Sequence, residues 1–503
     1  MTVTLNGLDD FGLSQFRRVA WDGEAVAIGA DGERAMAEAR SAFMAYVDDP
    51  ERVVYGVTSG YGDSAGQHLD AAGRKAMAES PPYHLGVGFG PAYPLRLARG
   101  ILFARLANFV SGLSAVRPRL AHEVAALLDG RDVPVLHRHG QMSSGEVEQL
   151  LPLIGHLIGP GRAEKEASAL LNGSPCAAAL LSDAALRARH RVGVMARVLA
   201  LATDAAGLPE EAWDPALARA SRDRWMGPAF ATLAALRQGA ARPRRAWQPP
   251  VSFRIAPQLL AAAMRAADQA ASAAADWLAT VTDNPTFFTD EPAYEAGRVL
   301  TNGGFHNPVA TPHLATLAFV SADLATLAGR LVTKLHDERV TGLTNALAPA
   351  GTKLSTQRLR AVQMWFTERA RDAAQPAFIP ASDGGVLQSD IFLPAFPAYD
   401  KEETAADACL GAFACLAATA SQALWADGDR APAPPLRPAL AAVRAVFPPV
   451  DTVRDQGAAL ARLIAALQEA CLGNRPELAG NHAADRPFAS HSPAPEPDDG
   501  DRS

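Results

Sequence analysis

Cysteine is scarce in this 503-residue sequence. Its four cysteines, Cys176, Cys409, Cys415 and Cys471, contain no CxxC pair. This spacing excludes a disulfide framework and a thiolate zinc site, and it is typical of a protein in a reducing cytosol. An excess of basic residues is also lacking, because the net charge is −7. The sequence therefore lacks the electrostatic footprint of a protein that binds nucleic acid or an anionic membrane surface.

Segments that direct a chain to or across a membrane are not apparent either. The N-terminal residues MTVTLNGLDDFG show no basic stretch followed by an apolar one, so we expect no signal peptide. No run of about 18 uncharged apolar residues occurs, so we expect no membrane span. Hydrophobic residues make up 49% and charged residues 20%, which is ordinary for a globular protein. We expect a cytoplasmic enzyme that holds no metal.

Alanine is abundant and follows a helical period over much of the chain. Such stretches favour helices, and those with few charges are typical of helices packed on more than one face. The fold class predicted from this pattern is mainly α. The expected long helices are 256–281, 309–336, 353–374, 402–426 and 454–472, and shorter ones are expected at 96–129 and 146–158.

The chain divides into three parts by composition. Residues 1–190 carry Gly- and Pro-rich turns between short helical pieces, which indicates a loop-bearing catalytic domain. Residues 191–480 are expected to form a helical bundle. Residues 481–503 lack hydrophobic periodicity and are expected to be disordered.

Several short motifs follow one another in a characteristic order. They are RVVYGVTSGYG (52–62), Ser143-Ser144-Gly145, KEASALLNGS (165–174), QPPVSFR (248–254), TDNP (282–285), GGFH (303–306) and LQSD (387–390). Each motif alone is weak, but the series resembles the histidine/phenylalanine/tyrosine ammonia-lyase superfamily over about residues 10–475.

The resemblance implies a fold, an assembly and a reaction. It implies a mainly α-helical protein with a loop-rich N-terminal domain followed by a long central helical bundle. It also implies a homotetramer in which loops of three subunits build each active site around a small-molecule substrate. Members of the superfamily are carbon–nitrogen lyases that remove the α-amino group and a β-proton from an aromatic amino acid, leaving an α,β-unsaturated acid.

The resemblance also assigns roles to individual residues. Tyr55 matches the catalytic base on a lid loop, and a tyrosinate in a dry site suits abstraction of a weakly acidic β-proton. Arg254 matches the arginine that clamps the substrate carboxylate, for which a planar guanidinium is the natural partner. Asn172 matches an asparagine near the reacting centre. His84 and Leu85 fall where the family selects the substrate ring.

The family's electrophile is a methylidene-imidazolone (MIO), formed when an Ala-Ser-Gly triad cyclises. Ser143-Ser144-Gly145 retains the atoms for this reaction, with Ser144 as the serine that loses water. Its surroundings depart from the family pattern at several positions. The departures are Met142 for Gly, Glu146-Val147 for Asp-Leu, Pro249 for Asp, Val251 for Tyr, and Gly304 and Leu387 for Asn. So many changes around one feature predict that the electrophile is altered or absent.

A quaternary ammonium substrate offers a chemical reason for such a loss. It has no lone pair to add to an electrophile, and trimethylamine is already a competent leaving group. The sequence therefore favours ergothionase-like elimination of trimethylamine from a betaine. Gln388 and Asp390 lie in a segment with Phe392, Phe396 and Tyr399 that is suited to a quaternary ammonium group, or else forms a packed aromatic loop. The alternatives are an MIO-dependent histidine- or tyrosine-type ammonia-lyase, an aminomutase, and an inactive oligomeric homologue.

Overall fold

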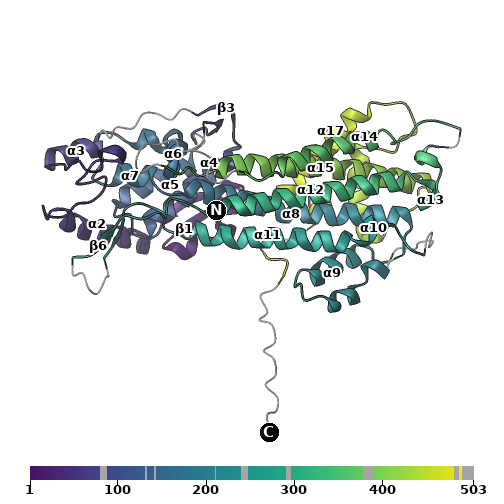
Figure 1. The fold of residues 1–503 in the computed structure, drawn as a ribbon, viewed down its shortest axis with the longest axis horizontal. Coiled ribbons are helices and arrows are strands. Elements are labelled where there is room, and N and C mark those ends of the chain that lie inside the picture. The colour runs from purple at the N-terminus through teal and green to yellow at the C-terminus, as the bar shows by residue number, and fades with distance from the viewer. Residues whose placement is uncertain are drawn as a thin grey trace, which may run out of the picture. The chain divides into compact units, whose positions relative to one another are not determined.

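The computed structural model forms two compact units, each built from segments distant in the sequence (Figure 1). The first unit contains residues 1–186, 269–316 and 375–403, and the second contains 187–268, 317–374 and 404–503. The first break lies close to the boundary predicted at residue 190. The later segments return to the first unit because the long helices continue from one unit into the other. The structure describes residues 1–79, 88–130, 133–140, 143–209, 211–239, 247–289, 296–349, 351–377, 390–480 and 486–489.

The first unit holds three two-stranded sheets among its described residues. One pair is parallel, with Thr2 beside Ala25, and the other two pairs are antiparallel. The last pair begins directly after the turn at 282–285. The strands are β1 (Thr2–Leu5), β2 (Ala25–Ile28), β3 (Phe89–Ala92), β4 (His137–His139), β5 (Thr286–Phe288) and β6 (Arg298–Leu300).

Helix α4 (Leu95–Val110) is the central element of the first unit. Every residue from Leu97 to Val110 is buried, including two arginines and an asparagine. A helix that is apolar on all sides belongs in a core rather than at a surface. Helix α4 contacts α1 (Leu13–Ala20), α2 (Ala30–Val47) and α5 (Pro118–Asp129). The unit also contains α3 (Ala71–Glu79), α6 (Val147–Ile154) and α7 (Glu166–Leu171), and α7 contacts both α3 and α6.

The second unit is a helical bundle built on four long helices that run side by side (Figure 1). Alanine is frequent where they pack, and its small side chain allows close approach of the helix backbones. The long helices are α8 (Pro175–Ala206), α11 (Ala256–Leu278), α12 (Ala310–Leu335) and α15 (Ala395–Ala426). The shorter ones are α9 (Met226–Leu236), α10 (Val251–Arg254), α13 (Glu338–Thr341), α14 (Leu359–Ala373), α16 (Arg437–Val446), α17 (Gln456–Cys471) and α18 (Pro476–Ala479).

The mainly α prediction is confirmed, and the helices predicted from alanine periodicity are present. Several boundaries differ. Helix α15 begins at Ala395 rather than at 402, α14 begins at Leu359 rather than at 353, and α6 ends at Ile154 rather than at 158. The segment 96–129 is two helices separated by 111–117. The 32-residue helix α8 was not predicted. Its middle carries Arg187, Arg189, His190 and Arg191, which interrupt the apolar pattern although all four are buried.

Part of the C-terminal segment expected to be disordered is ordered and packs on the bundle. The backbone N–H groups of Phe488 and Ala489 donate to the Asp268 carboxylate at 3.0 and 3.2 Å. The same carboxylate accepts from Trp225 Nε1 at 2.8 Å and from Arg189 at 3.2 Å. A buried carboxylate thus anchors residues 486–489, a contact that hydrophobic periodicity does not reveal.

Three helical segments are long and apolar enough by composition to cross a membrane: Glu166–Ala206, Ala310–Leu335 and Ala395–Ala426. No span was expected there because charged or polar residues interrupt the apolar runs, as Thr419, Ser421 and Gln422 do in the charge-free stretch 408–426. Their most apolar windows are 94%, 61% and 94% buried within the chain. Such burial is typical of helices in a protein core.

The Asp268 contacts predict a test of stability. Asp268→Asn should lower the free energy of unfolding by about 3 kcal/mol, because a buried carboxylate with several donors is replaced by a weaker and partly mismatched acceptor. Asp276→Asn, at an exposed position of the same helix, should change it by less than about 0.5 kcal/mol. Urea unfolding of both variants measures the difference, and equal losses would show that Asp268 anchors nothing.

Candidate active site

Tyr55 lies at the start of a tight loop in the first unit. Gly56 has φ +69°, and a Cβ there would overlap the ring of Tyr61. The rings of Tyr55 and Tyr61 meet edge to face, with centroids 6.0 Å apart. The N–H of Gly62 donates to the Tyr55 phenol oxygen at 3.0 Å. The loop therefore fixes the Tyr55 oxygen beside a hydrogen-bond donor.

The neighbouring phenol of Tyr61 has a different environment. It hydrogen-bonds Ser168 of α7, and burial raises the pKa of Tyr61 above its ordinary value. A phenol held in its protonated form is a poor proton acceptor. Tyr61 is therefore poorly suited to act as a base, whereas the Tyr55 oxygen accepts a hydrogen bond from the N–H of Gly62.

Asn172 joins two turns that are far apart in the sequence. Its Nδ2 donates to the carbonyl oxygen of Asn284 at 3.1 Å. Gly173 has φ +117°, where a Cβ would press against Thr282, and the N–H of Ser174 donates to Thr282 Oγ1 at 3.0 Å. The turns at 172–174 and 282–284 therefore form one junction.

Asn302 attaches a third segment to this junction. Its backbone N–H donates to Asn284 Oδ1 at 2.9 Å, and its Nδ2 donates to the Asp283 carbonyl at 3.1 Å. Its Oδ1 accepts from the N–H of Gly304 at 2.7 Å. Through these contacts the GGFH motif is held beside the two turns.

Within the Ser143-Ser144-Gly145 triad, Gly145 lies beside Asn172 of the junction. Gly145 has φ +66°, and its β position would lie 3.4 Å from Asn172 Oδ1 and 3.6 Å from the ring of Phe305. Asn172 Oδ1 is buried and has no hydrogen-bond partner among the described residues. Ser143 Oγ instead donates to Gln149 at 2.8 Å. The side chain of Ser144 lies outside the described part of the chain.

Glu146 fastens the triad to helix α8. Its two carboxylate oxygens accept from the N–H groups of Cys176 and Ala177 at 2.6 and 2.8 Å. The side chain is 2% exposed, and this burial raises its pKa to about 7 despite the two donors. The sequence marked Glu146 only as a departure from the family pattern, because nothing local indicates that it reaches the start of α8.

A buried ion pair lies behind the same turns. Lys165 Nζ donates to Asp283 Oδ2 at 2.6 Å, and both side chains are fully buried. Burial lowers the pKa of Lys165, and the nearby Asp283 carboxylate opposes that effect. Sequence reasoning missed this pair as well, since the two residues are 118 positions apart.

Arg254, the expected carboxylate clamp, belongs to the second unit. It ends α10, is partly buried, and its Nε has no hydrogen-bond partner. Val251, at the other end of α10, is 56% exposed. Arg254 therefore belongs to the second unit, whereas Tyr55 and Asn172 belong to the first.

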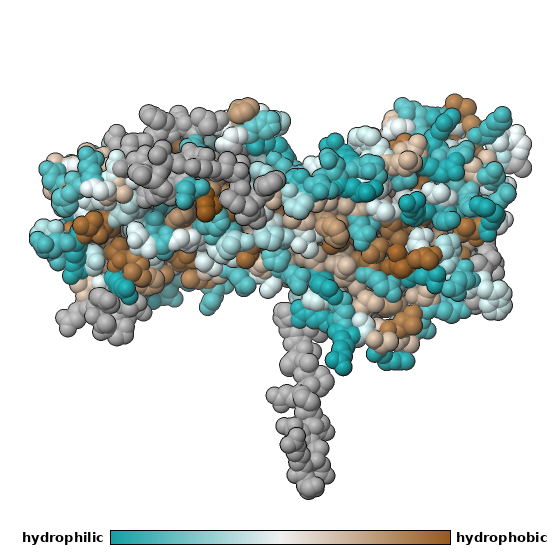
Figure 2. Space-filling model, viewed as in Figure 1, coloured by the Kyte–Doolittle hydropathy of each residue, from teal (hydrophilic) through white to brown (hydrophobic). Residues whose placement is uncertain are grey.

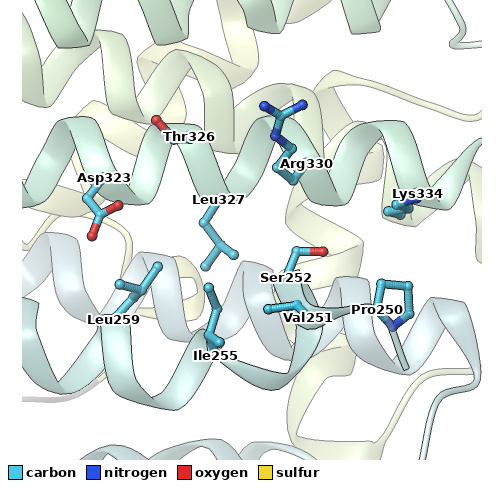
Figure 3. A pocket seen from close by; sticks show the side chains of 10 residues that line it. All are labelled: Pro250, Val251, Ser252, Ile255, Leu259, Asp323, Thr326, Leu327, Arg330 and Lys334. Carbon is cyan, nitrogen blue, oxygen red and sulfur yellow. The ribbon is translucent and has the colours of Figure 1, made fainter. Parts of the chain in front are cut away.

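Val251 lines an open groove of about 480 Å³ on the bundle. Apolar side chains gather on the surface of this unit (Figure 2), and Leu327 of α12 points across the groove towards Ile255 and Leu259 (Figure 3). The Arg330 guanidinium points away from α10 and α11, whereas Asp323 lies at the opposite end of the groove (Figure 3). Its walls are thus apolar, with charged groups along α12.

The remaining predicted residues are only partly described. His84, Leu85 and Gln388 lie outside the described residues, and Asp390 is exposed. Two aromatic residues of the 388–400 segment are buried. Phe396 packs against Tyr93 with ring centroids 5.6 Å apart, and the Tyr399 hydroxyl donates to Asp183 at 2.7 Å. These contacts favour the packed alternative for Phe396 and Tyr399.

Comparison with known proteins gives the family. The model of the aromatic amino acid lyase family matches residues 11–165 and 161–445. The chain belongs to this family and is a carbon–nitrogen lyase. Histidine ammonia-lyase of Streptomyces griseus is 29% identical over 465 residues, which cover 85% of this chain and 89% of that protein.

Solved structures show the same fold at low sequence identity. Ergothionase from Treponema denticola, in complex with desmethyl-ergothioneine sulfonic acid, superposes with a TM-score of 0.82 at 18% identity, covering 94% of this chain and all of that one. Tyrosine aminomutase from Streptomyces globisporus gives 0.84 at 19% identity, covering 96% and 100%. At such identities the likeness establishes the fold alone.

The raised pKa of Glu146 predicts a pH-dependent stability. Its folded pKa of about 7 exceeds the ordinary 4.5, so the folded protein binds this proton more tightly and loses stability as pH rises from about 4.5 to 7. The side chain in Glu146→Gln cannot ionise. The difference between the free energies of unfolding of the variant and the wild type should therefore rise in favour of the variant by up to about 3 kcal/mol from pH 5 to pH 8, at about 1.4 kcal/mol per pKa unit.

Urea unfolding at both pH values measures this gain. Glu148→Gln, at a partly buried position two residues on, should show none of it. If both variants differ from the wild type by amounts that do not change with pH, the Glu146 carboxyl is ionised throughout.

Proposed function

We propose that this chain eliminates trimethylamine from the trimethylated betaine of an aromatic or imidazole amino acid, without an MIO group. The observation that carries the proposal is the environment of Gly145. The buried amide oxygen of Asn172, which has no partner among the described residues, and the side chain of Phe305 both lie close to its β position. An amide oxygen and an aromatic ring both attract a quaternary ammonium group, whose positive charge lies on its methyl hydrogens.

The elimination needs a base and a leaving group. The Tyr55 phenolate removes the β-proton, and the electrons of that C–H bond form the Cα–Cβ double bond. The Cα–N bond breaks with its electron pair on nitrogen, releasing neutral trimethylamine and an α,β-unsaturated acid. The N–H of Gly62 faces the oxygen that carries the negative charge of the base. A donor fixed in that place stabilises the charge without reorganising solvent.

Residues other than Tyr55, Asn172 and Phe305 orient the substrate. We infer that Arg254 binds the substrate carboxylate through two parallel hydrogen bonds, which hold the α-carbon in a fixed orientation. Its buried Nε has no hydrogen-bond partner among the described residues, which leaves one of its donors without a protein acceptor there. We also propose that His84 and Leu85 contact the ring, that Gln388 and Asp390 line the site, and that the enzyme is a cytoplasmic homotetramer with shared active sites.

The residues around the triad do not fit an MIO group. The single carbonyl oxygen of an imidazolone ring accepts hydrogen bonds, whereas the polar atom nearest the β position of Gly145 is itself an acceptor, Asn172 Oδ1. Ser143 is engaged with Gln149 and with the N–H of Glu148. Val251 and Gly304 carry no polar side chain. No catalytic step is therefore assigned to Ser144.

The second candidate is an MIO-dependent ammonia-lyase of the histidine or tyrosine type. Relatives named histidine ammonia-lyase favour it, and the triad retains the atoms for cyclisation. An aminomutase and an inactive homologue are lesser candidates. The leaving group separates these possibilities, because only the proposed reaction releases trimethylamine.

The assigned base is tested by removing one oxygen atom. Tyr55→Phe should lower kcat by about 10²- to 10⁴-fold with little change in KM, because it removes the proton acceptor and keeps the ring. Tyr61→Phe is the matched control in the same loop, and it should keep most of its activity. A Tyr55→Phe enzyme with near-normal kcat would exclude the assigned role.

Ser144→Ala separates the two leading candidates. In an MIO-free enzyme it should leave turnover within about threefold of the wild type, with a stability loss near 1 kcal/mol if it removes a helix cap. The assay offers histidine, tyrosine and their trimethylated betaines, including the thioimidazole betaine, and measures the unsaturated acid, ammonia and trimethylamine. Rapid ammonia release that disappears in Ser144→Ala would favour the MIO-dependent candidate.

A further inference from the structure

Two buried polar residues on one face of α4 reach the junction of the turns. Arg105 and Asn108 are three positions apart, so they lie on the same side of the helix. Asn108 Oδ1 accepts from the N–H of Thr282 at 2.6 Å. Arg105 Nη1 donates to the carbonyl oxygens of Ala169 and Asn172 at 2.9 and 2.5 Å. One helix face thus holds both turns.

Burial of the Arg105 side chain at this position is unfavourable for folding. It is fully buried, and its Nε and Nη2 have no hydrogen-bond partner. No carboxylate forms an ion pair with it among the described residues. Burying a charge without a direct partner disfavours folding, and an apolar side chain would fill the same space at lower cost.

The Arg105 guanidinium points towards the carbonyl groups that it binds. They belong to the C-terminal end of α7, where carbonyl groups lack partners within the helix and attract a cation. The chain then passes closely over the guanidinium. A Cβ on Gly173 would lie 3.2 Å from Arg105 Nη2. The guanidinium therefore fixes the backbone at the residue whose side chain faces Gly145.

We propose that Arg105 is a positioning residue for Asn172. By binding the Asn172 carbonyl, it directs the amide oxygen of that side chain at Gly145, while Asn108 fixes the opposite turn that receives the amide nitrogen. The catalytic consequence rests on the proposed function, in which Asn172 Oδ1 contacts the leaving group. The structural part of the proposal does not depend on the reaction.

The same helix offers a matched control. Arg99 is also a buried arginine of α4, at 7% exposure. It donates to the carbonyl oxygens of Val19, Leu128 and Glu24 at 2.8, 2.8 and 3.0 Å. Its chemistry is that of Arg105, but none of its partners belongs to the candidate site. Any general effect of losing a buried arginine should appear equally at both positions.

The kinetic experiment compares Arg105→Lys with Arg99→Lys, since lysine keeps the positive charge but cannot reproduce the planar set of hydrogen-bond donors of arginine. Both should lower the melting temperature. Only Arg105→Lys should lower kcat, by about 10- to 100-fold, because a displaced contact group is costly in that range. When Asn172 is already replaced by alanine, Arg105→Lys should lower kcat by less than about threefold, because the side chain through which Arg105 acts is absent. Equal kcat losses at both arginines, or losses that multiply in the double variant, would overturn the proposal.

Hydrogen exchange measures the same role without activity. Arg105→Lys should accelerate exchange in peptides covering 166–176, and Arg99→Lys should do so around 19–24 and 125–129 instead. If the wild type turned over none of the substrates, the proposed function would fail while this comparison still decided the role of Arg105. Unchanged exchange at 166–176 in Arg105→Lys would exclude it.

Discussion

The hydrogen bond from Asn172 Nδ2 to the Asn284 carbonyl is the contact on which the candidate site depends. It joins the end of α7 to a turn 112 residues later in the chain. The triad glycine lies beside Asn172 of the first turn, and the Asn302 segment is held by hydrogen bonds to the second turn. Since neither turn has regular secondary structure of its own, their shape comes from side chains that bind backbone groups.

Many of those side chains are charged and buried. Lys165 pairs with Asp283, Glu146 accepts from the start of α8, and Arg105 binds the carbonyls at the end of α7. Each requires a charge or a polar group to leave water, so an apolar core would be easier to stabilise. Such groups orient the backbone more specifically than apolar packing does, because hydrogen bonds have preferred angles. A site that must orient a small substrate gains from this rigidity.

Local patterns predicted the long helices and pointed to the loop that carries Tyr55, but they did not predict the buried polar contacts between the turns. Helices such as α11 and α12 follow from alanine periodicity, because that signal repeats along the segment itself. Tyr55 and Asn172 were found through short motifs. Glu146 and the Lys165–Asp283 pair act across long sequence separations, and one sequence carries no signal for such pairing. The catalytic and binding roles of all these site residues, including Tyr55 and Asn172, stay predictions, as do those of Arg254, His84, Leu85, Gln388 and Asp390.

The central claim is that the triad remains an ordinary peptide while the base and the substrate clamp are retained. The mass of the intact purified protein tests it most directly, with the peptide that contains Ser143-Ser144-Gly145 analysed separately. Cyclisation followed by loss of the serine hydroxyl removes two water molecules. The account predicts a mass equal to that of the unmodified sequence. A deficit of two waters confined to that peptide would contradict it.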